Sequence, residues 1–385
     1  MGVWDELTGQ SDAIEVFTAA ADGRNDGGSM THSWLITGPP GSGRSNIAYA
    51  FAAALLGNGD DDVVTQRQVD ARSHPDLGVL STERVIISIE EVRSLVATSQ
   101  FSPSVGRYRV MVIEDADRMA ERTSNVLLKA LEEPPPRTVW ILCAPSEADL
   151  IPTIRSRVRS VRLRVPGVDE VAQLISRRDD VDIATATRAA REAQSHIGMA
   201  HRLATNEDAR ARRDQTLQIA LKIRTVSDAV QAAATLLKLA GDDAKAITEE
   251  RDAQERASAM RSLGVEPGGT IPAQLRSQLK NLEEDQKRRA TRSLRDGIDR
   301  IAVDLLSLYR DVLLLQLGAD TEPINLSIFA ELEKAAARST PAQTLATMDA
   351  IATARKRIEG NVSPALALEA MLISATTSRQ TEAAR

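Results

Sequence analysis

The first 166 residues alternate short apolar runs with segments of helical periodicity. A strand covered on both faces is apolar almost throughout, so such runs predict buried strands. They lie at residues 34–37, 109–113 and 138–143. Apolar positions at helical spacing predict helices between them, over 4–22, from the glycine-rich loop to about 56, from Ser88 to about 99, and over 125–132. The alternation predicts an α/β fold built on a parallel sheet with flanking helices.

After Pro166-Gly167 the strand-like runs stop and helical periodicity continues to the C-terminus. Residues 168–205 predict three short helices, and the remainder predicts helices over 216–240, 242–263, 273–317, 325–338, 341–359 and 363–377, with a loop at 264–272. We therefore expect a nucleotide-binding type of core at 1–166, a small helical domain at 167–207 and an all-α domain at 208–385. The apolar repeat at 302–317 predicts core or subunit interface.

Two stretches of the all-α part, within a charged insertion near 241–295, are polar on all sides. They predict either a solvated helical hairpin or an interaction arm. The cations that could contact nucleic acid are Lys287, Arg288, Arg289, Arg292 and Arg295. A solvated charged face is the plainer interpretation of the same residues.

Composition narrows the class of protein. The chain has 385 residues, 42% of them hydrophobic, and a net charge of −6, which argues against a protein that coats nucleic acid with its whole surface. Its single cysteine, Cys143, excludes an internal disulfide and fits a reducing cytoplasm. The acidic N-terminal stretch predicts no signal peptide, and the longest aliphatic run, 47–56, is too short to span a membrane.

A glycine-rich loop stands between the first predicted strand and an alanine-rich helix. Strand, loop and helix in this order are what a phosphate-binding loop needs, since glycines let backbone N–H groups face the phosphates. The residues assigned to this role are Gly38, Pro39, Gly41, Gly43, Arg44 and Ser45. Arg44 stands where the consensus has lysine, and a long planar guanidinium fits that position poorly. We expect weak or static binding of ATP or ADP; the alternative is a glycine turn without a ligand.

Carboxylates follow the strand at 109–113 directly, in the stretch Glu114-Asp115-Ala116-Asp117. Ligands bind at the carboxyl ends of strands in α/β sheets, so Glu114 and Asp115 could hold Mg²⁺ and polarise a water. The alternative is an acidic cap for the next helix. An active P-loop ATPase has Asp before Glu, and the reversed order predicts impaired hydrolysis. One histidine at 74 without nearby cysteines predicts no zinc site.

The stretch from Asn125 to Arg159 joins a helix stopped by Pro134, a strand and a short turn that ends in Ser156-Arg157. Arginines then recur at 155, 157, 159, 162 and 164. One interpretation is a solvated basic strand edge. The other is that Arg157 leaves its own subunit and binds a phosphate on a neighbour, a role for which the planar fork of arginine is suited.

With these motifs together, above all LLKALEEPPPRTVWILCAP and TIRSR, the chain resembles bacterial clamp-loader subunits of the AAA+ family, and among them the delta-prime type of DNA polymerase III. The resemblance extends over the whole chain, and QKRRATRSLRDGIDRIAVDLLSLYRDVLL is similar to the collar of actinobacterial forms. It implies an AAA+ core, a helical lid and a helical collar. It also implies cytoplasmic partners: delta and gamma/tau subunits in a ring, the sliding clamp, and primer-template DNA through the complex.

In that family the Ser-Arg-Cys motif donates an arginine to the ATP site of the adjacent motor subunit. Here the motif is Ser156-Arg157-Val158, so the resemblance implies that Arg157 is an arginine finger acting in trans, with Ser156 beside it. The four zinc-binding cysteines of many relatives are missing.

The motor positions also depart from the family pattern. Only Ser146 lies near the first sensor position, and the lid sensor position holds His201, with Arg202 beside it as the candidate nucleotide contact. Together with Arg44 and the reversed acidic pair, these departures fit a stator. The alternative is an active AAA+ motor subunit of a clamp loader or a DNA-remodelling complex.

Overall fold

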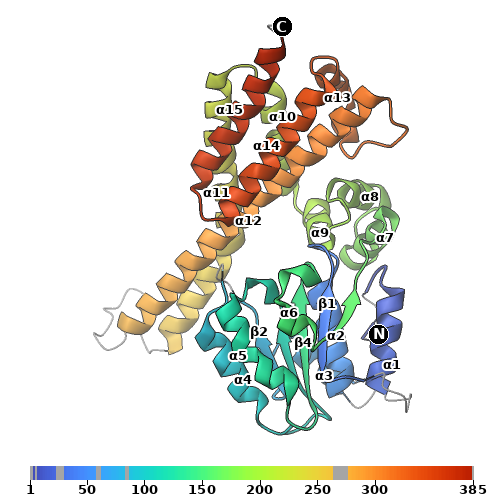
Figure 1. The fold of residues 1–385 in the computed structure, drawn as a ribbon, viewed down its shortest axis with the longest axis vertical. Coiled ribbons are helices and arrows are strands. Elements are labelled where there is room, and N and C mark those ends of the chain that lie inside the picture. Colours follow the sequence, from blue (N-terminus) through green and yellow to red (C-terminus); the bar gives the residue numbers. More distant parts are fainter. Residues whose placement is uncertain are drawn as a thin grey trace. The chain divides into compact units, whose positions relative to one another are not determined.

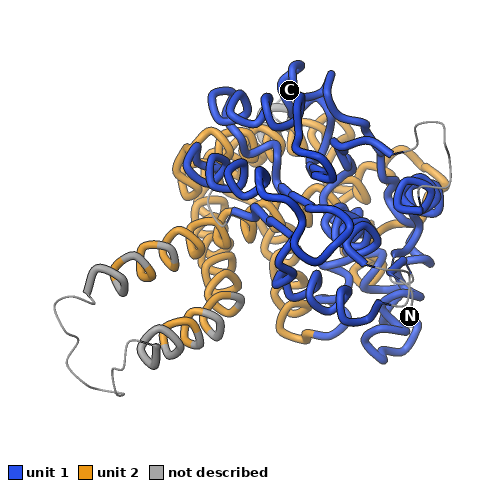
Figure 2. Tube along the Cα trace, turned by 90° about the horizontal axis from the view of Figure 1, so that it is seen from below, with its two compact units in different colours: residues 1–205 blue, residues 206–385 orange. Residues whose placement is uncertain are grey.

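The chain forms two compact units, residues 1–205 and residues 206–385, coloured separately in Figure 2. The computed structural model describes residues 3–4, 7–22, 30–57, 62–82, 86–262 and 276–383. The loops predicted at 27–29 and 264–272 lie outside the described residues. No helix among the described residues is long and apolar enough to cross a membrane.

The first unit is built on a five-stranded parallel sheet in the order β2-β3-β4-β1-β5 (Figure 1). The strands are β1 (Ser33–Thr37), β2 (Leu77–Leu80), β3 (Arg109–Ile113), β4 (Thr138–Ala144) and β5 (Arg159–Arg162). The three predicted apolar runs became β1, β3 and β4, which are buried along their whole length. The predicted parallel α/β core is confirmed.

Helices cover both faces of this sheet because side chains alternate along each strand. Trp34 and Ile36 of β1 pack with Phe17 of α1 (Ser11–Asp22) and Phe51 of α2 (Arg44–Leu56). Leu35 packs on the opposite face, with α4 (Ile89–Ser99) and α5 (Glu121–Glu132). The rings of Phe17, Trp34 and Phe51 are in mutual contact, with centroids 4.6 to 5.3 Å apart.

Two elements of this unit have no counterpart in the sequence prediction, and two helices have different bounds. The polar, acidic sequence of residues 58–76 predicts a surface excursion, but it contains α3 (Val63–Asp70), which begins where Asp62 accepts a hydrogen bond from the Thr65 amide (3.1 Å). The short β2 was also missed, because its half-buried sequence is only four residues long. Helix α5 begins before Asn125, and α1 begins at Ser11 rather than residue 4. The predicted capping box at Ser88 and Glu91 is present.

The three short helices expected after Gly167 are α7 (Val168–Asp179), α8 (Ile183–Glu192) and α9 (Ile197–Thr205). They belong to the same compact unit as the sheet. Turns between them use non-glycine residues at positive φ, such as Asp180 and Ser195. The separation of a lid from the core at residue 166 stays a prediction.

The second unit is helical throughout its described residues. Its elements are α10 (Glu207–Lys222), α11 (Val226–Ser262), α12 (Arg276–Leu317), the short η4 (Leu326–Ile328), α13 (Phe329–Ala336), α14 (Pro341–Glu359) and α15 (Pro364–Ala383). One apolar core joins them, and the predicted apolar repeat at 302–317 supplies Leu305, Leu308 and Val312 to it.

The helix boundaries around residue 225 differ from the prediction. The break lies at 223–225, where the Asp228 carboxylate accepts hydrogen bonds from the amides of Arg224 (3.0 Å) and Thr225 (2.8 Å). Helix α11 then runs through Gly241, where we expected a break, since one glycine in a helix interior costs only about 1 kcal/mol. A local cap therefore decided where the helix starts, and a lone glycine did not end it.

The charged insertion forms the facing ends of α11 and α12, and its cations pair within the chain. Arg289 contacts both Asp252 (2.5 Å) and Glu255 (3.0 Å), and Arg256 contacts Glu283 (2.6 Å). Arg295 donates to Asn361 Oδ1 at 2.6 Å. These contacts favour the solvated helical hairpin over a free nucleic-acid arm.

Candidate functional site

The glycine-rich loop lies at the carboxyl end of β1, between β4 and β5 in the sheet. Gly41 (φ +82°) and Gly43 (φ +88°) adopt the left-handed region, which turns successive N–H groups to one side. The Gly38 amide donates to the Pro145 carbonyl (3.2 Å) at the end of β4. Ser42 Oγ is buried and has no hydrogen-bond partner among the described residues. This backbone fits a phosphate group.

Arg44, the first residue of α2, turns back onto this loop. Its Nη1 donates to the Gly38 carbonyl at 2.6 Å. The guanidinium is thus already engaged by the loop that it would serve, whereas a P-loop lysine is a compact charge directed at the phosphates. Beneath it, Cys143 Sγ lies 3.9 Å from the Arg44 carbonyl oxygen, and burial raises the pKa of the thiol to about 12.

The structure brings together Ser45, assigned to the phosphate loop, and Glu114, one of the two carboxylates that could hold Mg²⁺. Ser45 Oγ donates to Glu114 Oε2 at 3.4 Å. The other carboxylate oxygen accepts hydrogen bonds from the Tyr49 hydroxyl and from Arg72 Nη2 (3.3 Å). Arg72 also donates to the Tyr49 oxygen (3.0 Å) and stacks on its ring (4.7 Å). Burial, with the hydrogen bond to Glu114, raises the pKa of Tyr49 well above its ordinary value.

Tyr49 and Arg72 were not predicted as part of the site. Ser45 and Glu114 offer the oxygen ligands that Mg²⁺ prefers. Arg72, however, already balances the negative charge of Glu114, which weakens the attraction of this site for Mg²⁺. Asp115 forms an ion pair with Arg118 at 3.6 Å. Burial raises the pKa of Asp117, the third carboxylate of the stretch. No group of three or more metal-binding side chains occurs in the part of the chain that the structure describes.

The start of α9 packs directly on the glycine-rich loop, a contact that the sequence reading missed. The Ile197 amide donates to the Gly41 carbonyl (3.3 Å), and a Cβ on Gly41 would lie 2.3 Å from Cγ of His196. His196 is fixed there because its Nδ1 accepts a hydrogen bond from the Met199 amide (3.2 Å). The imidazole therefore occupies the space that a side chain at residue 41 would need.

Gly41→Ala is expected to destabilise the first unit by more than Gly43→Ala does. Both replacements force alanine into the left-handed region, at a cost of about 1–2 kcal/mol. At Gly43 the nearest atom to a new Cβ is 3.9 Å away, whereas at Gly41 the new Cβ overlaps His196 and adds about 1–3 kcal/mol. Urea unfolding followed by tryptophan fluorescence measures both.

The same comparison in a His196→Ala background provides the control. Removing the imidazole should abolish the excess cost of Gly41→Ala and leave that of Gly43→Ala unchanged. Equal destabilisation by the two glycine variants in the original chain would contradict the packing described here.

A buried glutamine near the N-terminus ties the loop to the chain after β5. Gln10 Nε2 donates to the carbonyls of Ser42 (3.2 Å) and Arg164 (2.9 Å), and its Oε1 accepts from the Arg164 amide (3.2 Å). Long-range contacts of this kind leave no local pattern, so Gln10 could not be predicted as part of the site.

The predicted sensor residues are engaged elsewhere. Ser146 caps the turn η2 (Glu147–Asp149) by accepting from the Ala148 amide (3.2 Å). His201 Nδ1 lies 2.7 Å from Asp179 Oδ2. Arg202 is half-buried on α9. Ser146 and His201 thus have structural partners within the first unit.

Arg157 follows the one-turn helix α6 (Pro152–Arg155) and is held by three groups at the surface. Its Nε donates to Glu132 Oε1 (2.6 Å), and its Nη1 donates to the Thr153 carbonyl (2.7 Å) and to Ser156 Oγ (3.0 Å). The Arg157 side chain is 33% exposed and that of Glu132 is 44% exposed. Arg157 is therefore paired within its own chain and still partly exposed to solvent, and its predicted contact with a neighbouring subunit stays a prediction.

The other arginines of this stretch are distributed among separate contacts. Arg159 lies over the Trp34 ring at 5.0 Å, and Arg164 forms two hydrogen bonds to Glu170 (2.6 and 3.0 Å). Arg159 and Arg162 are exposed on β5, an edge strand of the sheet, so the interpretation as a solvated basic strand edge holds for these two residues. Arg157 differs from them because Ser156, its neighbour in the predicted motif, orients its guanidinium.

Comparison with known proteins agrees with the resemblance in the first unit. Residues 9–166 match the family described as DNA polymerase III, delta subunit. The chain is 31% identical over 154 residues to DNA polymerase III subunit delta' of Pseudomonas aeruginosa, which covers 38% of this chain and 47% of that protein. It is 27% identical over 182 residues to subunit gamma/tau of Mycobacterium tuberculosis, covering 42% of this chain and 28% of the relative. The chain thus spans less than half the length of these curated relatives.

Solved structures give weaker likenesses. A gamma subunit-related protein of Thermotoga maritima is 15% identical with a TM-score of 0.43, over 95% of this chain and 99% of that one. The Holliday junction branch migration motor RuvB of the same organism is 19% identical with a TM-score of 0.40, over 68% and 84%. Residues 9–166, which carry the parallel sheet and the glycine-rich loop, are thus similar in sequence to delta' and gamma/tau subunits of DNA polymerase III.

Proposed function

We propose that this chain is the delta-prime, or stator, subunit of a DNA polymerase III clamp loader, of the actinobacterial type. Its partners are the delta and gamma/tau subunits and the sliding clamp, with primer-template DNA held through the complex in the cytoplasm. The proposal divides the chain into an AAA+ core (1–166), a lid (167–207) and a collar (208–385). The first unit supports the role, since the sequence match to the family lies within it.

The observation that carries the proposal is the contrast between two arginines. Arg157 is one-third exposed at the end of a short helix, and Ser156 presents its guanidinium at the surface. Arg44, in the chain's own loop, is hydrogen-bonded to the loop backbone. A guanidinium at the surface can complete a phosphate site on a neighbour, where it stabilises the charge of the transferred phosphoryl group.

The chain's own site supports nucleotide binding without turnover. The glycine backbone fits the phosphates of ATP or ADP through Gly38, Pro39, Gly41 and Gly43, with Ser45 at the helix start. Hydrolysis would need a free carboxylate to position water, and the nearest ones, Glu114 and Asp115, are held by cations of the chain.

ATPase activity of the isolated chain tests the proposal. We expect no turnover above background, and no further change on Arg44→Ala. The second candidate, an active motor subunit, is favoured by the approach of Ser45 to Glu114, the arrangement that a working P-loop ATPase needs. Turnover at a motor's rate that is lost in Arg44→Ala would establish that candidate and reject the stator.

Arg72→Ala is expected to make nucleotide binding respond to Mg²⁺. In the original chain Arg72 balances the charge of Glu114, so Mg²⁺ should change the affinity for ATP little. Removing the guanidinium takes away the positive charge beside Glu114 while the hydrogen bonds from Tyr49 and Ser45 remain, and we expect Mg²⁺ then to tighten ATP binding about tenfold. Fluorescence titration with a labelled ATP analogue, in Mg²⁺ and in chelator, measures the ratio.

Arg67→Ala is the matched control, because Arg67 is an exposed arginine in the last turn of α3. It should leave the ratio as in the original chain. A strong Mg²⁺ dependence before any substitution would show that Arg72 does not stand in for the metal's charge.

A further inference from the structure

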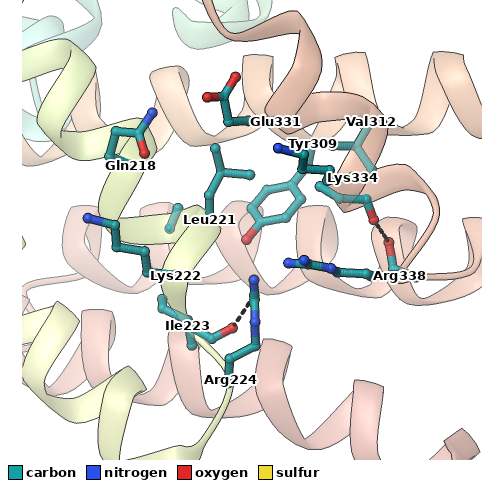
Figure 3. A pocket seen from close by; sticks show the side chains of 13 residues that line it. Gln218, Leu221, Lys222, Ile223, Arg224, Tyr309, Val312, Glu331, Lys334 and Arg338 are labelled. Carbon is teal, nitrogen blue, oxygen red and sulfur yellow. Dashed lines mark hydrogen bonds between the residues drawn. The ribbon is translucent and has the colours of Figure 1, made fainter.

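A pocket of about 370 Å³ opens in the second unit where the end of α10, the middle of α12 and α13 meet (Figure 3). Its volume falls in the range of roughly 300–1,000 Å³ that is usual for ligand sites. All of its lining residues lie between 218 and 339. The nucleotide loop and Arg157 belong to the other unit, so this pocket is a different site from the two that carry the proposed function, and it lies in the proposed collar.

One wall of the pocket is apolar. Leu221, Ile223, Tyr309 and Val312 line it, and the last three are almost fully buried. Figure 3 shows the Tyr309 ring in the middle of the pocket. Binding of an apolar group against this wall is favourable because it removes apolar surface from water, whereas a bare ion would not cover that surface.

The rim of the pocket is strongly cationic. Lys222, Arg224, Lys334 and Arg338 line it, against one acidic lining residue, Glu331. Among the described residues none of the four cations forms an ion pair within 4 Å, and Arg224 Nη1 donates to the neighbouring Ile223 carbonyl (3.0 Å). The Asp228 carboxylate accepts from the Arg224 amide (3.0 Å), and its pKa is lowered by hydrogen bonds from the amides of Thr225 and Arg224 and, to a smaller extent, by the charge of Arg224. In Figure 3 the side chains of Arg224 and Arg338 point toward one another beside the Tyr309 ring.

A purely structural role explains only part of this cluster. Lys222 ends α10 and Lys334 lies in the last turn of α13, where each can offset the helix dipole by about 0.3–1 kcal/mol. Arg224 and Arg338 lie beyond these helix ends. Two guanidinium groups directed toward one another repel, and an oxyanion between them would relieve the repulsion and accept their paired N–H groups.

We propose that this pocket binds an acidic peptide segment of a partner protein. A carboxylate sits between Arg224 and Arg338, and an adjacent apolar side chain packs against Leu221 and Val312. A nucleic-acid backbone supplies the charge but presents phosphate and sugar, with no apolar group for the wall. A peptide that alternates acidic and apolar residues satisfies both parts of the site.

Fluorescence anisotropy on the full chain tests this proposal, with a fluorescein-labelled hexapeptide of alternating aspartate and leucine as the probe. We expect saturable binding that weakens as salt is raised. The Arg224→Gln/Arg338→Gln double variant should bind about tenfold or more weakly, as should a probe with asparagine in place of aspartate. Lys334→Gln should give a smaller loss in the same direction.

Arg357→Gln is the matched control, because Arg357 is an exposed cation in the last turn of α14 and does not line the pocket. It should bind the probe as the original chain does. Equal loss in Arg357→Gln, undiminished binding by the double variant, or no saturable binding would overturn the proposal. If a single-stranded oligonucleotide bound more tightly than the peptide and its binding depended on the same two arginines, the ligand of the pocket would be a nucleic acid rather than a peptide. Circular dichroism melting verifies that each variant is folded.

Discussion

Arg157→Ala in the assembled complex is expected to slow ATP hydrolysis at the adjacent motor subunit by about 10³- to 10⁵-fold. The lost guanidinium would no longer stabilise the charge that develops on the transferred phosphoryl group. Assembly should survive, because the change removes one surface side chain. The measurement is steady-state hydrolysis with sliding clamp and primed DNA, with the other motor sites inactivated so that one interface is observed.

Two further substitutions sharpen this test. Arg155→Ala removes another exposed arginine two residues away and should leave hydrolysis unchanged. Arg157→Lys should recover little, because lysine keeps the charge and loses the planar fork. Unchanged turnover in Arg157→Ala, with assembly shown by gel filtration, would refute the role in trans.

The resting contact of Arg157 with Glu132 does not oppose this role. Both side chains are substantially exposed, and an ion pair of this kind contributes about 0–1 kcal/mol. Exchange of the Glu132 carboxylate for a phosphate is therefore inexpensive. Thr153 and Ser156 can keep their hydrogen bonds to Nη1 while the other side of the fork changes partner.

Asp76→Asn is expected to cost about 3–5 kcal/mol of the unfolding free energy of the first unit, because it leaves a buried charge without its partner. Asp76 is fully buried and pairs with Arg109 (2.9 Å). Its carboxylate also accepts hydrogen bonds from the amides of Ser104 (2.7 Å), Val105 (2.7 Å) and Gly106 (2.8 Å). The three tryptophans of the chain, at 4, 34 and 140, all lie in this unit, so their fluorescence in urea reports its unfolding.

The Asp76 carboxylate also predicts that the unfolding free energy of the first unit depends on pH. Burial raises the pKa of Asp76, but the hydrogen bonds from Gly106, Ser104 and Val105 outweigh it and hold the pKa at about 2. Since the unfolded value is about 3.9, the contribution is complete above that pH and is lost as the pH falls toward 2. Asp76→Asn should lack this part of the acid destabilisation.

Asp180→Asn is the matched control. Asp180 is exposed and adopts positive φ (52°) at the end of α7, a conformation that asparagine also accepts. It should change the unfolding free energy little. A similar loss in both variants would mean that the network around Asp76 is not what holds the loop at 104–106.

The periodicity of apolar residues predicted the buried strands and the long helices, and the glycine spacing predicted the phosphate-binding loop. The strands β3 and β4 have continuous apolar runs because both faces of the sheet are covered, and the glycine spacing placed the phosphate loop before α2. The helices of the second unit were predictable because their core residues recur at helical spacing. What failed were short or half-exposed elements such as β2, whose signal is too brief to separate from a loop.

The site was predictable only where its residues are neighbours in sequence or follow a strand end. Glu114 was found this way, but its partner Arg72 is 42 residues away and came from a stretch read as a surface excursion. His196 reaches Gly41 through the packing of α9, and the hydrogen bonds to Asp76 come from backbone amides. No residue type or spacing encodes contacts of these kinds.

Because Cys143 is buried, its reactivity can report local opening of the sheet in the first unit. The thiol is the only one in the sequence, it is completely buried in β4 beneath the start of α2, and burial keeps it protonated. A thiol reagent can reach Cys143 only when that part of the sheet opens. The rate of alkylation therefore measures how often this local opening occurs. Cysteines introduced at the surface could be labelled selectively without first removing the native one.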